Sequence, residues 1–300
     1  MNFDLSDDQL ALRDGIRSLL DGRFDSARVR SGFDRPMFDE LAAAGVFSLR
    51  ADGFGWADAA IVFEELGRAF VPGPLVWAFL AHGTIDGIVG GVERTAGSFV
   101  EHPERIDALI VLDDDRVEWV ARAALPLEPV DRPLDPLTPV ARVAALPTGE
   151  VLGADADTDA WRRGGAVLTA AFGVGLAARA AELAVGHAST REQFDRVIGS
   201  FQAVKHLCAD TAVRTELARV ATHAAALHLD DPDLGDVDRA VHGAKVLAGE
   251  AAIANARSSL QVYGGMGFTW EVDVHLLLKR AWVLDTHFGS IDAHADALPG

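Results

Sequence analysis

Four long, alanine-rich segments fill most of the second half of the chain, and they constrain the fold more than any other feature. They span residues 158–190, 201–229, 236–263 and 272–286, with short glycine- or aspartate-containing stretches between them. Small side chains let helices approach closely, so these segments predict an up-and-down four-helix bundle. In the third segment, helical spacing predicts an inward-facing stripe at Val241, Ala244, Leu247, Ala248, Ala251 and Ala254.

The rest of the chain divides into two regions of different pattern. Residues 1–104 carry short amphipathic helical patterns, the first of them beginning after Ser6 as a helix N-cap. Within residues 105–155, two apolar runs flank the acidic stretch 113–115, which is typical of two strands around a turn. The predicted fold is therefore mainly α with a small β insert, followed by a helical domain over residues 156–300.

Composition and charge exclude several classes of function. The net charge is −18, so the chain lacks the basic stripe that nucleic-acid binding requires. The histidines and the single cysteine, Cys208, show no metal-ligand spacing, and no metal site is predicted. The apolar stretch 164–188 contains Arg179 and Glu182, which favours a buried helix over a membrane span. Because the acidic N-terminus has no signal-peptide pattern, we expect a cytoplasmic protein.

A glycine-rich motif follows the third long segment. Gly264 and Gly265 are natural helix C-cap residues, and local physics alone favours helix termination as their role. The alternative is a loop where backbone N–H groups reach an anion or a flat ligand without an intervening Cβ. Gln261, one helical turn earlier, adds a side-chain amide to the same place.

A second motif lies at the junction between the first two long segments, where Arg191, Phe194 and Gln202 fall close together. An arginine suits a diphosphate, an aromatic ring suits stacking, and a glutamine supplies both a donor and an acceptor. The alternative is an interhelical loop in which Phe194 acts as a hydrophobic plug.

Together these two motifs resemble the acyl-CoA dehydrogenase family, which carries R-x-x-F-G…F-Q and, later, Q-x-x-G-G-x-G-(Y/F)-T. The matching residues here are Arg191, Phe194, Gln202, Gln261, Gly264, Gly265, Gly267, Phe268 and Thr269. The resemblance implies a helical domain, a β domain and a four-helix bundle, with FAD bound between domains and between subunits. It also implies α,β-desaturation of an acyl-CoA thioester, with an electron-transfer flavoprotein reoxidising the flavin.

The chain departs from the family at the catalytic base. The family's usual base is the glutamate of a Y-E-G-T stretch, which matches His287 to Ser290 here, so Phe288 stands at the base position. A second base position known in the family falls near Gly165. Neither is acidic, so no catalytic residue is predicted. Asp285 and Glu271 are the nearby acids, and Ser290 joins the expected cofactor-binding residues.

The predicted β domain is also short, without the family's FAD-contacting T-E-P-x-A-G-S-D loop. This pattern resembles the short chains of two-gene, α2β2 acyl-CoA dehydrogenases from steroid-degrading actinobacteria. We therefore expect a heterotetramer in which this chain completes the FAD site of a longer partner, and the partner supplies the glutamate. Two alternatives stay open: a self-sufficient flavoenzyme with a relocated base, and a non-enzymatic structural or acyl-CoA-binding subunit. Asp195, where the family has glycine, places a carboxylate unfavourably near a diphosphate.

Overall fold

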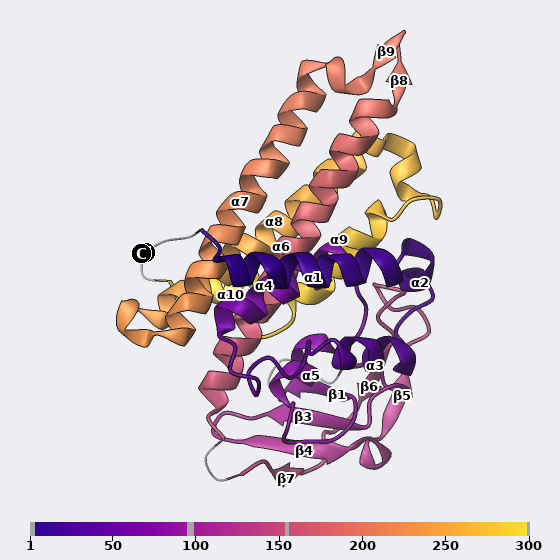
Figure 1. Ribbon diagram of the computed structural model, residues 1–300. Helices are drawn as coiled ribbons and strands as arrows, with labels where there is room; N and C mark the ends of the chain where they lie inside the picture. The colour runs from indigo at the N-terminus through magenta and orange to yellow at the C-terminus, as the bar shows by residue number, and fades with distance from the viewer. Residues whose placement is uncertain (1–3, 95–98, 154–155, 299–300) are drawn as a thin grey trace.

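Helices dominate the computed structural model, which describes residues 4–94, 99–153 and 156–298 (Figure 1). The second half of the chain forms the predicted bundle: α6 (Thr158–Thr190), α7 (Gln202–Asp230), α8 (Val237–Tyr263) and α9 (Val274–Asp285), followed by the short α10 (Ile291–Asp296). The predicted ends of the four long helices are right to within two residues, because local caps set them. Asp236, for example, accepts a hydrogen bond from the Arg239 N–H and begins α8.

Short helices from the first half of the chain lie partly across the bundle and partly beside the sheets (Figure 1). They are α1 (Asp7–Arg23), α2 (Ser26–Arg30), α3 (Arg35–Ala43), α4 (Trp56–Arg68) and α5 (Leu75–Leu80). Ser6 caps α1 as predicted, its Oγ lying 3.2 Å from the Gln9 N–H that donates to it. Helix α4 lies directly on α6, where a Cβ built on Gly175 would overlap the Glu64 carbonyl oxygen. Glycine in α6 therefore serves close helix packing.

Two small sheets lie below the bundle in Figure 1. One has the order β1-β3-β4-β7, from Val89–Glu93, Ala108–Leu112, Val117–Ala121 and Glu150–Val151; the other has the order β2-β6-β5, from Phe99–Glu101, Val140–Val143 and Leu127–Pro129. Strands β3 and β4 are antiparallel around the acidic turn, with Ile110 opposite Trp119, as the sequence predicted.

The prediction of helix up to residue 104 is wrong for residues 89–93 and 99–101, which are strands. Strand β1 pairs in parallel with β3, Val89 lying opposite Ala108. Its two glycines hide the strand pattern, and Gly91 is needed because a Cβ there would overlap the Trp77 ring. This strand forms because it pairs with the distant strand β3, and the local sequence pattern carries no information about that pairing.

Two residues of the predicted inward stripe on α8 reach the surface, since Leu247 is exposed and Ala254 is only half-buried. Ala244, Ala248 and Ala251 are buried against the other helices, but Leu247 is 39% exposed. Successive residues of a helix are about 100° apart, so Leu247 lies on the flank of the stripe that passes through Ala248. Its side chain instead borders a surface hollow described below.

Helix α6 is long and apolar enough to cross a membrane by length and composition. In the fold it is the central helix of the bundle, and 72% of its most apolar 18-residue window is buried inside the molecule. Helices α4, α7 and α8 pack around it. Its apolar character is thus accounted for by packing against other helices of the chain.

Candidate functional site

The first sequence motif forms a protruding hairpin at the upper end of the bundle (Figure 1). Strands β8 (Glu192–Gln193) and β9 (Arg196–Val197) pair there, leaving Phe194 and Asp195 as a two-residue turn. Both have positive φ, 55° and 61°, as a type I′ turn requires. The Phe194 side chain is 86% exposed, so it is not the interhelical plug that the alternative interpretation predicted.

The two polar residues of this motif flank the hairpin. Arg191 is the C-cap of α6, and Gln202 is the first residue of α7; both are exposed. Arg191 forms no ion pair with any residue that the structure describes. Its guanidinium is available to an anion outside the chain.

The glycine motif ends α8 and opens into solvent. Gly264 has φ of 60°, and its N–H donates to the carbonyls of Gln261 and Leu260, so helix termination is one of its roles. A short 3-10 helix, η4 (Gly264–Phe268), follows. A Cβ built on Gly264 or Gly265 would meet no atom within 4 Å. The positive φ explains glycine at position 264, whereas no contact within this chain explains glycine at position 265.

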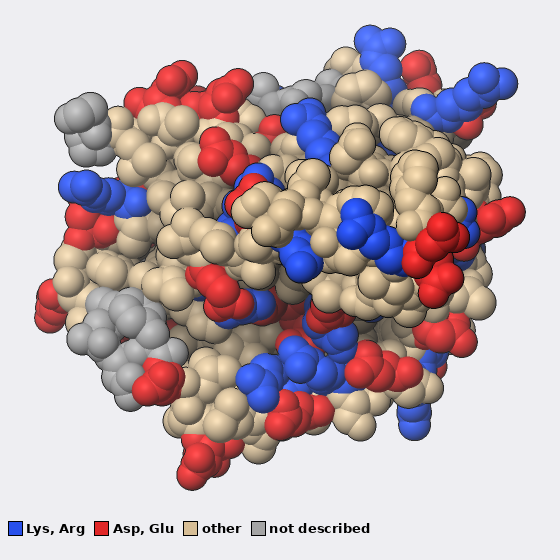
Figure 2. Space-filling model, turned by 90° about the horizontal axis from the view of Figure 1, so that it is seen from above, with Lys and Arg blue, Asp and Glu red and all other residues tan. Residues whose placement is uncertain are grey.

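The fold brings the two motifs to one end of the bundle. The His187 ring of α6 stacks on the Tyr263 ring of α8, with centroids 4.0 Å apart and planes 15° apart. A small apolar cluster, which we call the satellite cluster, ties the same helix ends together; it consists of Ala184, Ala188, Ile198, Val204, Leu207, Cys208 and Val262. Seen from above, basic and acidic side chains are interspersed on this face of the molecule (Figure 2).

Ser290 lies away from this end. Its Oγ accepts a hydrogen bond from the Ala293 N–H at 3.2 Å and caps α10. Helix α10 packs near the start of α8, where His294 Nδ1 lies 2.7 Å from His242 Nδ1. From His242 to Gln261 the helix rises roughly 28 Å at about 1.5 Å per residue. Ser290 therefore cannot join the motif residues of its own chain in one small site.

The two expected base positions are in direct contact with each other. Phe288 is 3% exposed, and a Cβ built on Gly165 would overlap its ring. On its other side the ring of Phe288 packs against Trp77, with centroids 4.3 Å apart. An aromatic ring thus fills the space between the two positions, and neither carries an acid.

A cavity of about 540 Å³ opens beside Phe288, between the end of α9 and the two sheets. Its walls are mostly apolar, with Trp77, Trp282 and Phe99 among the lining residues, and exposed Arg132 lies at its edge. Sequence reasoning missed one feature of this cavity, a contact in which His287 Nε2 lies 2.7 Å from Glu101 Oε1. The pairing joins distant parts of the chain, and no local signal could have found it.

Burial and pairing set the charges in this cavity. Burial alone would raise the pKa of Glu101, but the adjacent His287 holds that pKa below its usual value. Burial lowers the pKa of the neighbouring His102 to about 4, so its ring is neutral near pH 7. The cavity therefore holds an anionic carboxylate that His287 already engages.

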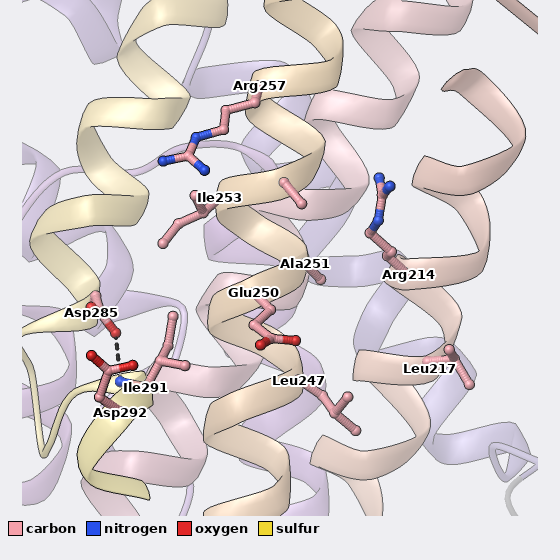
Figure 3. A pocket seen from close by; sticks show the side chains of 11 residues that line it. Arg214, Leu217, Leu247, Glu250, Ala251, Ile253, Arg257, Asp285, Ile291 and Asp292 are labelled. Carbon is pink, nitrogen blue, oxygen red and sulfur yellow. Dashed lines mark hydrogen bonds between the residues drawn. The ribbon is translucent and has the colours of Figure 1, made fainter. Parts of the chain in front are cut away.

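The two remaining acids take other positions. Asp285 Oδ1 accepts a hydrogen bond from the Ile291 N–H at 2.8 Å, and its side chain borders a different hollow (Figure 3). Glu271 is exposed in the turn before α9. Neither lines the cavity beside Phe288. Over residues 4–94, 99–153 and 156–298, no group of three His, Cys, Asp or Glu side chains is placed to hold a metal ion.

The donor set at the bundle end fits the nucleotide part of FAD. A diphosphate is bound by arginine and by open backbone N–H groups, and the ribose and ring edges are bound by glutamine amides. This end of the bundle offers one unpaired arginine, an open glycine backbone and two exposed glutamines. The sequence of residues 105–155 has no counterpart of the T-E-P-x-A-G-S-D loop that the resemblance leads us to expect against FAD. The residues of this chain fit a contribution to a flavin site, made from one side.

Comparisons with known proteins agree with this geometry. The model of the acyl-CoA dehydrogenase C-terminal domain matches residues 163–298. Acyl-CoA dehydrogenase IpdE2 of Mycobacterium tuberculosis is 34% identical, over 90% of this chain and 89% of its own length. Acyl-CoA dehydrogenase FadE34 of the same organism is 31% identical over 92% of this chain, but this chain spans only 45% of its length.

The fold has a close counterpart among solved structures. A chain in the crystal structure of the ChsE4-ChsE5 complex from Mycobacterium tuberculosis superposes with a TM-score of 0.82, covering 99% of this chain and 97% of that one. The two share 23% sequence identity, so this likeness concerns the fold. Taken with the match to IpdE2 along nearly its whole length, it means that this chain belongs to the acyl-CoA dehydrogenase family.

Proposed function

We propose that this chain is a subunit of a heteromeric acyl-CoA dehydrogenase, completing the FAD site of a longer partner that supplies the catalytic glutamate. One observation carries the proposal: the Phe288 ring lies on Gly165, so neither base position of the family offers a carboxylate. The open bundle end supports the other half of it. The exposed groups suited to a flavin nucleotide lie at the end of the bundle that is remote from this chain's own β region (Figure 1).

The relatives support a shared assembly. The ChsE4-ChsE5 structure is a complex of two proteins. FadE34 is more than twice as long as the segment that matches this chain, so it carries a further region of comparable size. A complex of this chain with a larger, related chain would bring together two regions that FadE34 carries in one chain. The α2β2 stoichiometry and a steroid-derived acyl-CoA as substrate follow from the same resemblance.

Each motif residue has a defined task in this assembly. Arg191 pairs with the FAD diphosphate, and Gln202 and Gln261 donate hydrogen bonds to the nucleotide. Gly264 and Gly265 let their backbone approach the cofactor closely. Bound FAD supplies the acceptor for the hydride that leaves the acyl β-carbon. The partner's glutamate takes the α-proton, and an electron-transfer flavoprotein in the cytoplasm accepts the electrons.

Flavin per chain is the decisive measurement. The chain is co-expressed with an acyl-CoA dehydrogenase-like partner, the complex is purified, and FAD is counted against each polypeptide. We expect one FAD per unlike pair and none on this chain alone. Full flavin occupancy and turnover by this chain without a partner would contradict the proposal.

A matched pair of arginine variants tests the bundle end. Arg191→Ala should raise the Kd of the complex for FAD by about tenfold or more, and so lower its FAD occupancy after purification, because one charge-assisted contact contributes about 1.5–3 kcal/mol. Arg239→Ala, an exposed arginine near the other end of α8, is the control and should leave occupancy unchanged. Equal FAD occupancy in the two variant complexes would remove Arg191 from the flavin site.

The cavity beside Phe288 favours a second candidate, a flavin-free subunit that binds acyl-CoA. Its volume of about 540 Å³ and aromatic walls suit an acyl chain, and Arg132 at its edge suits a phosphate. This candidate predicts a colourless complex that still binds a thioester in a calorimetric titration. A yellow complex with stoichiometric FAD would exclude it.

A further inference from the structure

Two stacked rings at the bundle end adjoin the residues that we assign to the flavin. The ring of His187, from α6, lies on the ring of Tyr263, from α8, with their planes 15° apart. Tyr263 immediately precedes Gly264 in the chain. The His187 carbonyl accepts a hydrogen bond from the Arg191 N–H at 2.9 Å. The stacked pair therefore adjoins both the glycine motif and the arginine assigned to the FAD diphosphate.

Both nitrogens of the His187 ring are open to solvent. Neither forms a hydrogen bond or an ion pair with any residue over 4–94, 99–153 and 156–298. Neither belongs to the buried polar atoms that lack a partner, so water reaches them. Tyr263 covers one face of the ring and fixes its plane, while the polar edge stays free. Packing between two helices does not by itself require such an edge.

The charge of Arg191 affects the protonation of this ring. Burial lowers the pKa of His187, and the nearby positive charge of Arg191 lowers it further. The ring is therefore neutral near pH 7. An anion placed beside both side chains offsets the arginine charge and favours the protonated ring, because an opposite charge stabilises the charged form.

The other titratable side chains at this end come from three elements. Burial raises the pKa of Tyr263 on α8 and of Cys208 on α7, so neither becomes charged below pH 8. His206 is exposed near the start of α7, and the acids Glu192 and Asp195 lie in the hairpin. Histidine is the side chain that ordinarily titrates between pH 5 and 8. A pH effect on this site in that range therefore belongs to one of its two histidines.

We propose that His187 is an additional FAD-binding residue of this chain, and that its protonated ring edge pairs with the cofactor's diphosphate beside Arg191. The inference rests on the proposed function, since it concerns the same site. A diphosphate carries more than one negative charge, while Arg191 supplies a single positive one. Protonated His187 supplies another. FAD binding then takes up a proton, so FAD binds more tightly as the pH falls.

The pH dependence of FAD affinity tests this inference. FAD is titrated into the flavin-free complex of this chain with its partner, and flavin fluorescence gives Kd between about pH 5 and pH 8. We expect the wild-type Kd to rise about tenfold across this range, which corresponds to roughly one pKa unit in the ring. His187→Phe keeps a ring on Tyr263, and His187→Gln keeps a polar side chain. Neither holds the proton, so both should lose most of the pH dependence.

Proton uptake gives a second readout, which needs no variant. Calorimetry of FAD binding in buffers of different ionisation enthalpy measures the protons taken up per FAD. We expect a net uptake near pH 7 in the wild-type complex and almost none in the two His187 variants. Circular dichroism checks that each variant is folded.

His206→Gln is the matched control, because it removes an exposed histidine from the same end of the bundle. It should keep the wild-type slope and proton uptake. Three results would overturn the inference: a wild-type Kd that does not change with pH, His187 variants that keep the wild-type slope, or a slope that disappears in His206→Gln. One FAD per unlike pair with a flat pH profile contradicts this inference alone. A complex that binds no FAD contradicts the proposed function as well.

Discussion

The ring of Phe288 lies against the bare backbone of Gly165, so an aromatic side chain fills the space between the two positions at which we expected a catalytic carboxylate. We expect Gly165→Ala to lower the free energy of unfolding by about 1–3 kcal/mol, because the added methyl overlaps a ring already packed on Trp77. Urea denaturation measures the change.

Gly186→Ala is the matched control for that variant. Gly186 lies in the same helix, and a Cβ there would meet nothing within 4 Å. Alanine should therefore stabilise the chain by up to about 1 kcal/mol through helix propensity. If both variants shift stability in the same direction, the contact between Phe288 and Gly165 is not what constrains this position.

Asp195 occupies a backbone conformation that glycine adopts more easily. Its φ is 61°, in the tip of the hairpin at the bundle end. We expect Asp195→Gly to raise the free energy of unfolding by roughly 0.5–1 kcal/mol, since the left-handed region costs an L-residue about 1–2 kcal/mol. The same change removes a carboxylate near Arg191, so FAD should bind the complex more tightly. A weaker flavin complex would argue against the diphosphate lying at this hairpin.

Lys245 makes stability depend on pH in the alkaline range. It is 2% exposed, its Nζ donates to the Gly289 carbonyl at 2.8 Å, and burial lowers its pKa from 10.5 to about 8. Between these two pH values the unfolded chain binds more protons than the folded one, so this group makes stability rise with pH. The rise is on the order of 3 kcal/mol in full.

The comparison with Lys245→Met isolates this effect from other titrating groups. The unfolding free energy of wild type minus that of the variant should become more positive from pH 8 to pH 10.5, and urea denaturation at several pH values measures it. A difference that stays constant or shrinks would mean that the buried amine keeps an ordinary pKa.

Asp285 and Glu271 should have no part in turnover. We expect the complex with Asp285→Asn or Glu271→Gln to keep kcat within about twofold of wild type, because a general base must lie within hydrogen-bond reach of its proton and neither residue lines the cavity beside Phe288. Asp285→Ala should instead cost about 1 kcal/mol of stability, because the Ile291 N–H loses its acceptor. A large fall in kcat for Asp285→Asn or Glu271→Gln would instead support the alternative that this chain is a self-sufficient flavoenzyme with a relocated base.

The sequence predicts the bundle well because its determinants are local. Asp236 and Gly264 mark the two ends of α8 by capping, and each lies within a few residues of the helix it terminates. The periodicity of small apolar residues then indicates which face is inward. Leu247 shows the limit of prediction from periodicity. It is adjacent in sequence to the buried Ala248, and a step of one residue along the helix moves the side chain from the core to the wall of a surface hollow.

Features that depend on distant residues could not be predicted in the same way. Strand β1 exists because β3 pairs with it and Trp77 covers Gly91, and no window of sequence contains these contacts. The ion pair between His287 and Glu101 joins the end of α9 to β2 for the same reason. The resemblance located Phe288 and Gly165 separately, and only the fold places them in contact.

The satellite cluster gives the bundle end its own local stability. Only Ala184, Ala188 and Val262 are fully buried in it, so opening this end exposes far less apolar surface than unfolding the main core. Amide hydrogens around the Arg191 hairpin should therefore exchange through local opening, well before those at the centre of α6. A flavin-bearing partner that docks there would slow this exchange, and part of its binding free energy would be spent on ordering the hairpin.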